Sequence, residues 1–94
     1  MAHARKQLPV FPGEGELRYR GFKGQVEYQI QGEPGSLRFG PARLRGALTA
    51  SPEIAEEAFR EGEGQLTLEN GTVYRLTMLG HTPGSGAVYF EMRI

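Results

Sequence analysis

Cysteine and aspartate are both missing from this 94-residue sequence, and each absence excludes a class of chemistry. Without cysteine the chain forms no disulfide, offers no thiolate nucleophile and builds no cysteine metal site. All eleven acidic side chains are glutamates, so a nucleophilic triad would have to combine serine or threonine with histidine and glutamate. A chain without cysteine suits a reducing compartment, and we expect a cytoplasmic location.

Long apolar runs are missing too. No segment approaches the ~20 apolar residues of a membrane span. Residues 1–16, MAHARKQLPVFPGEGE, lack the apolar stretch of a secretory signal. We therefore expect neither a membrane-spanning segment nor a membrane partner.

Net charge is absent because eleven lysines and arginines balance the eleven glutamates. The two halves differ, however: residues 1–50 carry eight basic and four acidic side chains, whereas residues 51–94 carry three and seven. This division either guides self-association or contact with a charged partner, or it is neutralised within one fold. Neutralisation within the fold is the interpretation we favour.

The residues that are present predict one small β-rich domain. The length fits a single folding unit, and 14 glycines with 38% hydrophobic residues fit a domain with many tight turns. Residues 1–15 contain two prolines and two glycines and no periodic apolar pattern, which predicts a flexible N-terminal arm. Residues 16–94 then form the single folded domain, with organised structure beginning at Leu17.

Alternation of apolar and polar residues predicts strands at four places before residue 50. A period of two is typical of a half-buried strand. It occurs in LRYR, QVEYQIQ, SLRF and ARLRGALT, which are residues 17–20, 25–31, 36–39 and 42–49. GEPG at residues 32–35 predicts a turn. Because Pro41 interrupts the last two runs, they are either two strands or one bent strand.

One segment, SPEIAEEAFREG at residues 51–62, predicts a helix. Ser51 is a typical N-cap, and Pro52 suits the first helical position, where its missing N–H is not needed. Gly62 is a typical terminator. The apolar side chains share one face, at Ile54, Ala55, Ala58 and Phe59.

Strands return after the helix. Asn70-Gly71 lies between two alternating runs and predicts a hairpin with a type I′ turn, which needs positive φ at both residues. A last alternating run, AVYFEMRI, occupies residues 87–94. The predicted fold class is α+β and mainly β, namely a bent antiparallel sheet or small β-barrel of six to seven strands with one short α-helix at about residues 52–61.

The glycine-rich stretch LGHTPGSGAVYF, residues 79–90, invites comparison with phosphate-binding loops. A Walker A loop needs a lysine and a following helix, but no lysine occurs after Lys23 and a strand follows Gly86. The dinucleotide-binding pattern would need a glycine where Tyr89 stands. The simpler interpretation is a long, flexible connection between two strands. Its candidate contact residues are His81, Thr82 and Ser85.

No catalytic set is evident. His81 would need an orienting carboxylate and a nucleophile, but the serines lie at a turn, a helix cap and the loop, where local structure explains them. The two histidines lack the spacing of a zinc site. The glutamates fall on outward positions, where solvation or pairing with arginine accounts for them. We therefore expect no enzyme activity, no metal and no cofactor.

Arginines alternate with apolar residues on several predicted strands. If these strands were neighbours, their arginines would form a basic stripe with Tyr89 and Lys23 close by, as in proteins that bind single-stranded nucleic acid. The alternative is a set of cross-strand arginine–glutamate pairs, and the zero net charge favours it. The candidate binding residues are Arg18, Arg20, Arg43, Arg45, Arg75 and Tyr89.

The function we expect is that of a small non-catalytic binding or assembly module, which contacts another protein or a second copy of itself. Residues 87–94 could form an edge strand that pairs with a partner, and the arm at residues 1–15 could become ordered on contact. The alternative is a module that binds nucleic acid or another anionic ligand through an arginine-lined sheet face.

Overall fold

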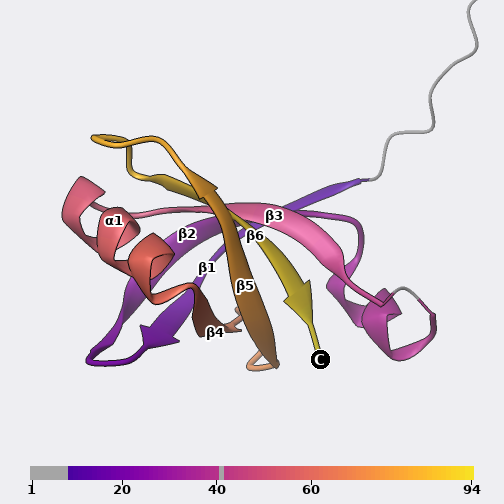
Figure 1. Cartoon of the computed structure of the whole chain (residues 1–94). Coiled ribbons are helices and arrows are strands. Elements are labelled where there is room, and N and C mark those ends of the chain that lie inside the picture. The colour runs from indigo at the N-terminus through magenta and orange to yellow at the C-terminus, as the bar shows by residue number, and fades with distance from the viewer. Residues whose placement is uncertain (1–8, 41) are drawn as a thin grey trace, which may run out of the picture.

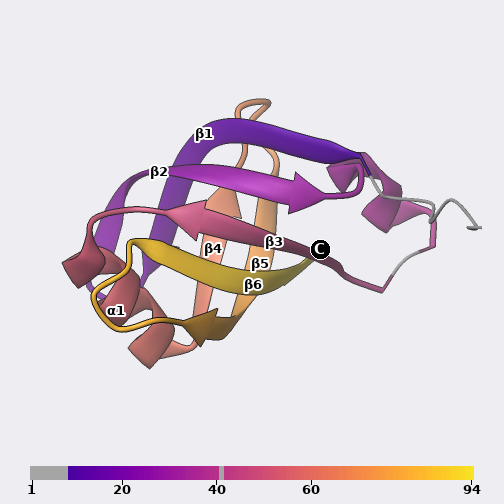
Figure 2. The same ribbon diagram turned by 90° about the horizontal axis from the view of Figure 1, so that it is seen from above.

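The computed structural model describes residues 9–40 and 42–94, which form six strands, one α-helix and one short 3-10 helix (Figure 1). The strands are β1 Val10–Tyr19, β2 Phe22–Gln31, β3 Leu44–Thr49, β4 Glu63–Thr67, β5 Val73–His81 and β6 Ala87–Arg93. The helix α1 is Pro52–Glu61, and the 3-10 helix η1 is Pro34–Arg38. The two helices lie at opposite ends of the strands (Figure 2).

The six strands close into an antiparallel barrel in the order β1-β2-β3-β6-β5-β4, with β4 pairing back onto β1. This confirms the predicted fold class. Because β6 lies between β3 and β5, the expectation that residues 87–94 form an edge strand is wrong. Both sides of β6 are used by the barrel itself, and a partner strand has no ladder to join there.

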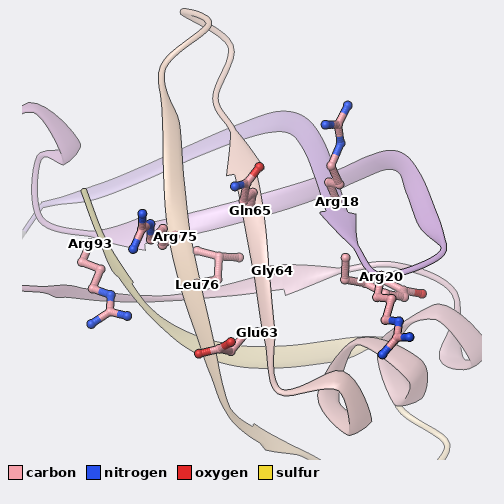
Figure 3. A pocket seen from close by; sticks show the side chains of 9 residues that line it. Arg18, Arg20, Glu63, Gly64, Gln65, Arg75, Leu76 and Arg93 are labelled. Carbon is pink, nitrogen blue, oxygen red and sulfur yellow. The ribbon is translucent and has the colours of Figure 1, made fainter.

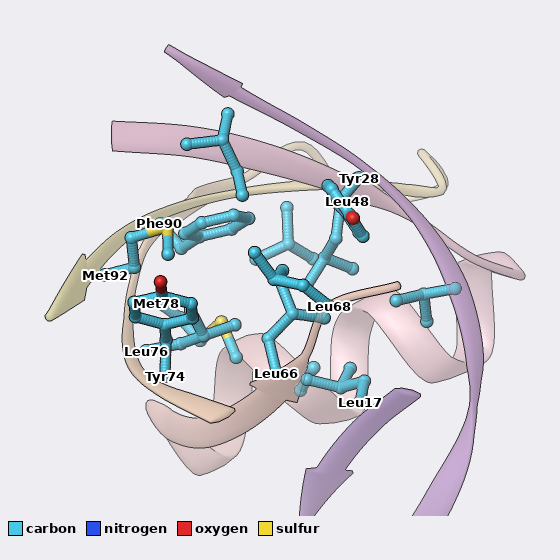
Figure 4. Close-up of a cluster of buried hydrophobic side chains, with 14 of the residues drawn as sticks. Leu17, Tyr28, Leu48, Leu66, Leu68, Tyr74, Leu76, Met78, Phe90 and Met92 are labelled. Carbon is cyan, nitrogen blue, oxygen red and sulfur yellow. The ribbon is translucent and has the colours of Figure 1, made fainter. Parts of the chain in front are cut away.

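Apolar side chains that alternate inward fill the barrel (Figure 4). The helix α1 packs against β4, β5 and β6 and covers one end of the core with Ala55 and Ala58, which are both fully buried. The largest fully buried side chains are Leu17, Ile30, Leu48, Leu66, Leu76, Val88, Phe90 and Met92.

The first strand starts earlier than predicted. β1 begins at Val10 and pairs with β2 along its whole length, so residues 10–15 belong to a strand and not to an arm. The segment at residues 1–8 lies outside the described residues. Prolines and glycines made this part of the sequence look like a linker, whereas its strand conformation depends on a partner, β2, that local patterning does not reveal.

The first half of β1 extends beyond β4, and the side of the strand that faces away from β2 there is blocked against further pairing. β1 pairs with β4 only at residues 16–18. The Glu14 N–H lies on the open side and donates a hydrogen bond to Oε2 of Glu69 at 2.9 Å. Since backbone groups alternate along a strand, Pro12 takes the same side and has no N–H to offer. These features disfavour the addition of a partner strand at this edge.

Residues 36–39 are not a strand, which corrects the sequence-based prediction. Pro34 begins the 3-10 helix η1, in which the Ser36 N–H donates to the Glu33 carbonyl at 3.0 Å and the Phe39 N–H donates to the Ser36 carbonyl at 2.9 Å. Four alternating residues are too few to separate a strand from a helical turn. The predicted interruption at Pro41 lies outside the described residues.

The helix at residues 52–61 is confirmed. Ser51 Oγ accepts a hydrogen bond from the Ile54 N–H at 3.3 Å, and Gly62 ends the helix with a φ of 83°. The apolar face is narrower than predicted because Phe59 is 40% exposed. Its ring lies 6.0 Å from that of His81, between the helix and the end of β5.

The hairpin between β4 and β5 is confirmed, but its predicted type I′ turn is wrong. The Leu68 carbonyl accepts from the Gly71 N–H at 2.9 Å, and the Leu68 N–H donates to the Thr72 carbonyl at 2.9 Å. Positive φ occurs at Gly71 (88°) and not at Asn70. Asn70 instead accepts from the Thr72 N–H through Oδ1 at 2.9 Å, which stabilises this longer turn.

Candidate anion-binding site

Basic side chains from several strands meet on the outer face of the barrel. On β1, Leu17 and Tyr19 are buried and Arg18 between them is exposed. The same alternation exposes Arg75 on β5 and Arg93 on β6. Because the apolar residues of each strand pack into the core and side chains alternate between the two faces, the arginines point outward.

Strand register places these residues side by side. Arg18 pairs with Lys23 on β2 and with Gln65 on β4, Gln65 pairs with Arg75, and Arg75 pairs with Arg93. We call this set the basic row. In the order in which it crosses five strands, it consists of Lys23, Arg18, Gln65, Arg75 and Arg93.

Most of the basic row borders one open pocket of about 610 Å³. Figure 3 shows Arg75 and Arg93 on one side of β4 and Arg18 with Arg20 on the other, with Gln65 between them. Among the residues that the structure describes, Glu63 is the one acidic residue that lines the pocket. Arg20, which follows the end of β1, is the further cation.

The arginines of this pocket have no carboxylate partner within the described residues. No ion pair within 4.0 Å involves Arg18, Arg20, Arg75 or Arg93 there. Arg75 and Arg93 stand directly opposite each other on β5 and β6. Like charges at facing positions destabilise a sheet unless an anion lies between them. The pocket therefore carries uncompensated positive charge.

The other predicted arginines are placed differently, which divides the expected stripe in two. Arg43 Nη1 lies 2.9 Å from Glu91 Oε2, and Arg45 Nη2 lies 3.7 Å from Glu91 Oε1. Arg43 and Arg45 therefore form arginine–glutamate pairs, which was the alternative to a basic stripe. Tyr89 also lies away from the pocket, in a separate hollow of about 390 Å³ that Arg45 borders.

The floor of the pocket is tied to the helix by Tyr19. Its hydroxyl donates a hydrogen bond to Glu57 Oε1 at 2.8 Å, and its ring stacks on Phe22 with centroids 4.8 Å apart. Burial, followed by the hydrogen bond to Glu57, raises the pKa of Tyr19 well above its usual value. The phenol therefore stays protonated and holds the end of β1 against α1.

The predicted contact loop uses its polar groups internally. His81 belongs to β5, and its Nε2 donates to the Ser85 carbonyl at 2.8 Å. Ser85 Oγ accepts from the Ala87 N–H at 3.0 Å, while the Ser85 N–H donates to the Thr82 carbonyl at 2.9 Å. The Gly86 carbonyl accepts from the Ala50 N–H at 2.9 Å. The extra length of the loop therefore lets it pack against Ala50, in the connection between β3 and α1.

Two residues of the basic row, Gln65 and Arg93, were missed by the sequence-based prediction. Both were visible as outward positions of alternating runs, but only register shows that they adjoin Arg75. Over the part of the chain that the structure describes, no three His, Cys, Asp or Glu side chains gather as metal ligands. Within the same ranges, no helix is long and apolar enough to cross a membrane.

Comparison with protein-family models, with curated proteins and with solved structures found no match for this chain.

Proposed function

We propose that the protein is a non-catalytic module that binds a phosphate-bearing ligand in the pocket between β1, β4, β5 and β6. The observation that carries the proposal is the facing pair Arg75 and Arg93, which has no carboxylate within ion-pair distance in the described residues. An anion held between the two guanidinium groups removes their repulsion, and that gain adds to the binding free energy.

The side chains suit phosphate. Guanidinium groups donate parallel N–H bonds that match phosphate oxygens, and Arg18 and Arg20 add two more from the far side of the pocket. Gln65 offers an amide N–H₂ at the centre. The lining, as far as residues 9–40 and 42–94 provide it, contains one carboxylate and neither imidazole nor a serine or threonine hydroxyl, which supports binding without a chemical step.

Titration with inorganic tripolyphosphate at ~50 mM salt, where phosphate contacts are strongest, tests the proposal. Arg75→Ala with Arg93→Ala should weaken binding by about 10- to 100-fold, because two charge-assisted contacts are lost. Arg43→Ala with Arg45→Ala is the matched control, since it removes the same charge at two residues that do not line the pocket and should weaken binding by about three- to fivefold at most, through long-range charge alone. Equal losses in both double variants, or no binding by the unaltered protein, would contradict the proposal.

A second candidate function is contact with another protein or a second copy through the hollow that Tyr89 borders. Leu79 at 46%, Val10 at 55% and Tyr89 at 56% exposure all line it. Leu79 takes the outward face of β5 by the same alternation that exposes Arg75 and Thr77, and the register shift between Met78 and Gly80 leaves it without a facing residue on β6. If the protein self-associates here, Leu79→Ser should lower its mass in light scattering, whereas Val73→Ser, an exposed position on the same strand, should not.

A further inference from the structure

The basic row is longer than the pocket, and this bears on the size of the ligand. Lys23 does not line the pocket but continues the row on β2. Facing residues on neighbouring strands have Cβ atoms about 5 Å apart, so the four steps from Lys23 to Arg93 cover about 20 Å. The charges form two pairs, Lys23 with Arg18 and Arg75 with Arg93, and Gln65 separates them. A single phosphate group reaches one pair only.

The course of the row bears on the shape of the ligand. The row crosses five of the six strands of a closed barrel, so it follows the curved circumference. A nucleic-acid duplex is stiff over about 50 nm and cannot bend around the barrel to follow the row. A flexible single chain can follow the curve and meet both charge pairs.

The side chains that line the pocket indicate which groups of the ligand they contact. Proteins that hold single-stranded nucleic acid through its bases use exposed aromatic side chains as stacking platforms. Within the described part of the chain, the one aromatic residue that borders the pocket is Tyr19, which is buried. Tyr89, exposed on β6, lies four residues from Arg93 with Glu91 between them. The residues of the basic row therefore contact a ligand through its charged groups and not through its bases.

Building on the function proposed above, we infer that the basic row binds a flexible linear chain of phosphate groups, laid across the strands from Lys23 to Arg93 and contacted through its phosphates alone. The backbone of single-stranded nucleic acid and inorganic polyphosphate share this chemistry. Both are linear, flexible and charged at every unit.

Chain length is the first test. At about 3.4 Å of rise per stacked nucleotide, six nucleotides span about 20 Å. Affinity for oligo(dT) measured by fluorescence anisotropy should therefore rise steeply from two to about six nucleotides and then level off. Affinity that is the same for the shortest and the longest chains would overturn the inference.

Lys23→Gln separates the inference from the function on which it rests. Because Lys23 lies outside the pocket, this variant should bind tripolyphosphate as the unaltered protein does. It should bind a twelve-nucleotide oligo(dT) more weakly and lower the slope of log affinity against log salt by about 0.7, the share of one phosphate contact on a single strand. Arg60→Gln is the control, since Arg60 lies on α1 beside Glu56 and should leave the slope unchanged. If Lys23→Gln behaves as the unaltered protein with both ligands, the inference fails while the proposed function stands.

The chemical form of the ligand is the last test. An oligonucleotide of abasic sites should bind as tightly as oligo(dT), and a duplex of the same length should bind less tightly. A strong preference for bases or for duplex would overturn the inference. Long inorganic polyphosphate binding more tightly than oligo(dT) would identify polyphosphate as the source of the phosphate chain, and the reverse would identify nucleic acid. If tripolyphosphate itself does not bind, both proposals fail together.

Discussion

Arg43 and Arg45 share the carboxylate of Glu91, whereas Arg75 and Arg93 face each other without a carboxylate partner in the described residues. All four are exposed arginines on or beside barrel strands, and β6 provides both Glu91 and Arg93. What separates the two pairs is the side chain that register places opposite them. Arg45 faces Glu91, and Arg75 faces a second arginine.

Arginine alternation alone therefore does not define a binding surface. An exposed arginine beside a carboxylate contributes at most about 1 kcal/mol to stability and has little capacity left for a ligand. An arginine opposite another arginine is destabilising until an anion arrives. Substitutions that add a carboxylate to one pair, or remove one partner from either pair, test this difference.

Arg75→Glu should have the largest effect. It places a carboxylate opposite Arg93 and so converts the facing arginine pair into a cross-strand ion pair like that of Arg45 and Glu91. We expect tripolyphosphate affinity to fall by about 100-fold or more, because a donor is lost and a repulsive charge gained. Denaturant unfolding should show the free energy of unfolding unchanged or raised by about 0.5 kcal/mol. Retained binding would mean that the pocket acts without Arg75.

Tyr19→Phe tests whether the hydrogen bond beneath the pocket contributes to stability and not to anion binding. The loss of the hydrogen bond to Glu57 should lower the free energy of unfolding by about 1 kcal/mol, with anion affinity unchanged. The pH dependence follows from the raised pKa of Tyr19. The contribution of the phenol is complete below about pH 10, the usual tyrosine value, and is lost as pH rises above it, because the unfolded chain ionises first. Urea unfolding from pH 8 to 11 should show this decline in the unaltered protein and a smaller one in the variant.

Glu91→Gln should release Arg43 and Arg45 from their shared carboxylate. Because Glu91 lies next to Arg93 in the alternation of β6, the released charges would add to the basic surface. We expect tripolyphosphate to bind about three- to fivefold more tightly at low salt, with a steeper salt dependence. Unchanged affinity would show that the two arginine pairs are electrostatically independent.

Arg93→Gln should give the smallest change in stability. Removing one member of the facing pair relieves repulsion and should raise the free energy of unfolding by a few tenths of a kcal/mol at low salt. The gain should disappear near 1 M salt, where charges are screened within about 3 Å. A loss of stability at low salt would show that Arg93 has a favourable partner in the folded protein.

Local patterning predicted the elements of this fold well where neighbouring residues decide the outcome. The helix at residues 52–61 follows from a serine cap, a proline at the first position and a glycine at the end, all within one segment. Alternation predicted β2 and the inward face of β6 for the same reason. Patterning failed for residues 10–15, whose prolines and glycines hid a strand that depends on pairing with β2. It also failed for residues 36–39, where four alternating residues did not distinguish a strand from a 3-10 helix.

The candidate site shows the same division. From the sequence alone, Arg18, Arg43, Arg45 and Arg75 were recognisable as outward-facing, because the residues beside them are apolar and must enter the core. Whether a given arginine would face a glutamate, a glutamine or another arginine depended on which strands adjoin and in what register, and those pairings join residues far apart in the chain. The sequence thus determined which face each side chain takes, through the hydrophobic effect acting locally, and closure of the barrel decided which charges meet.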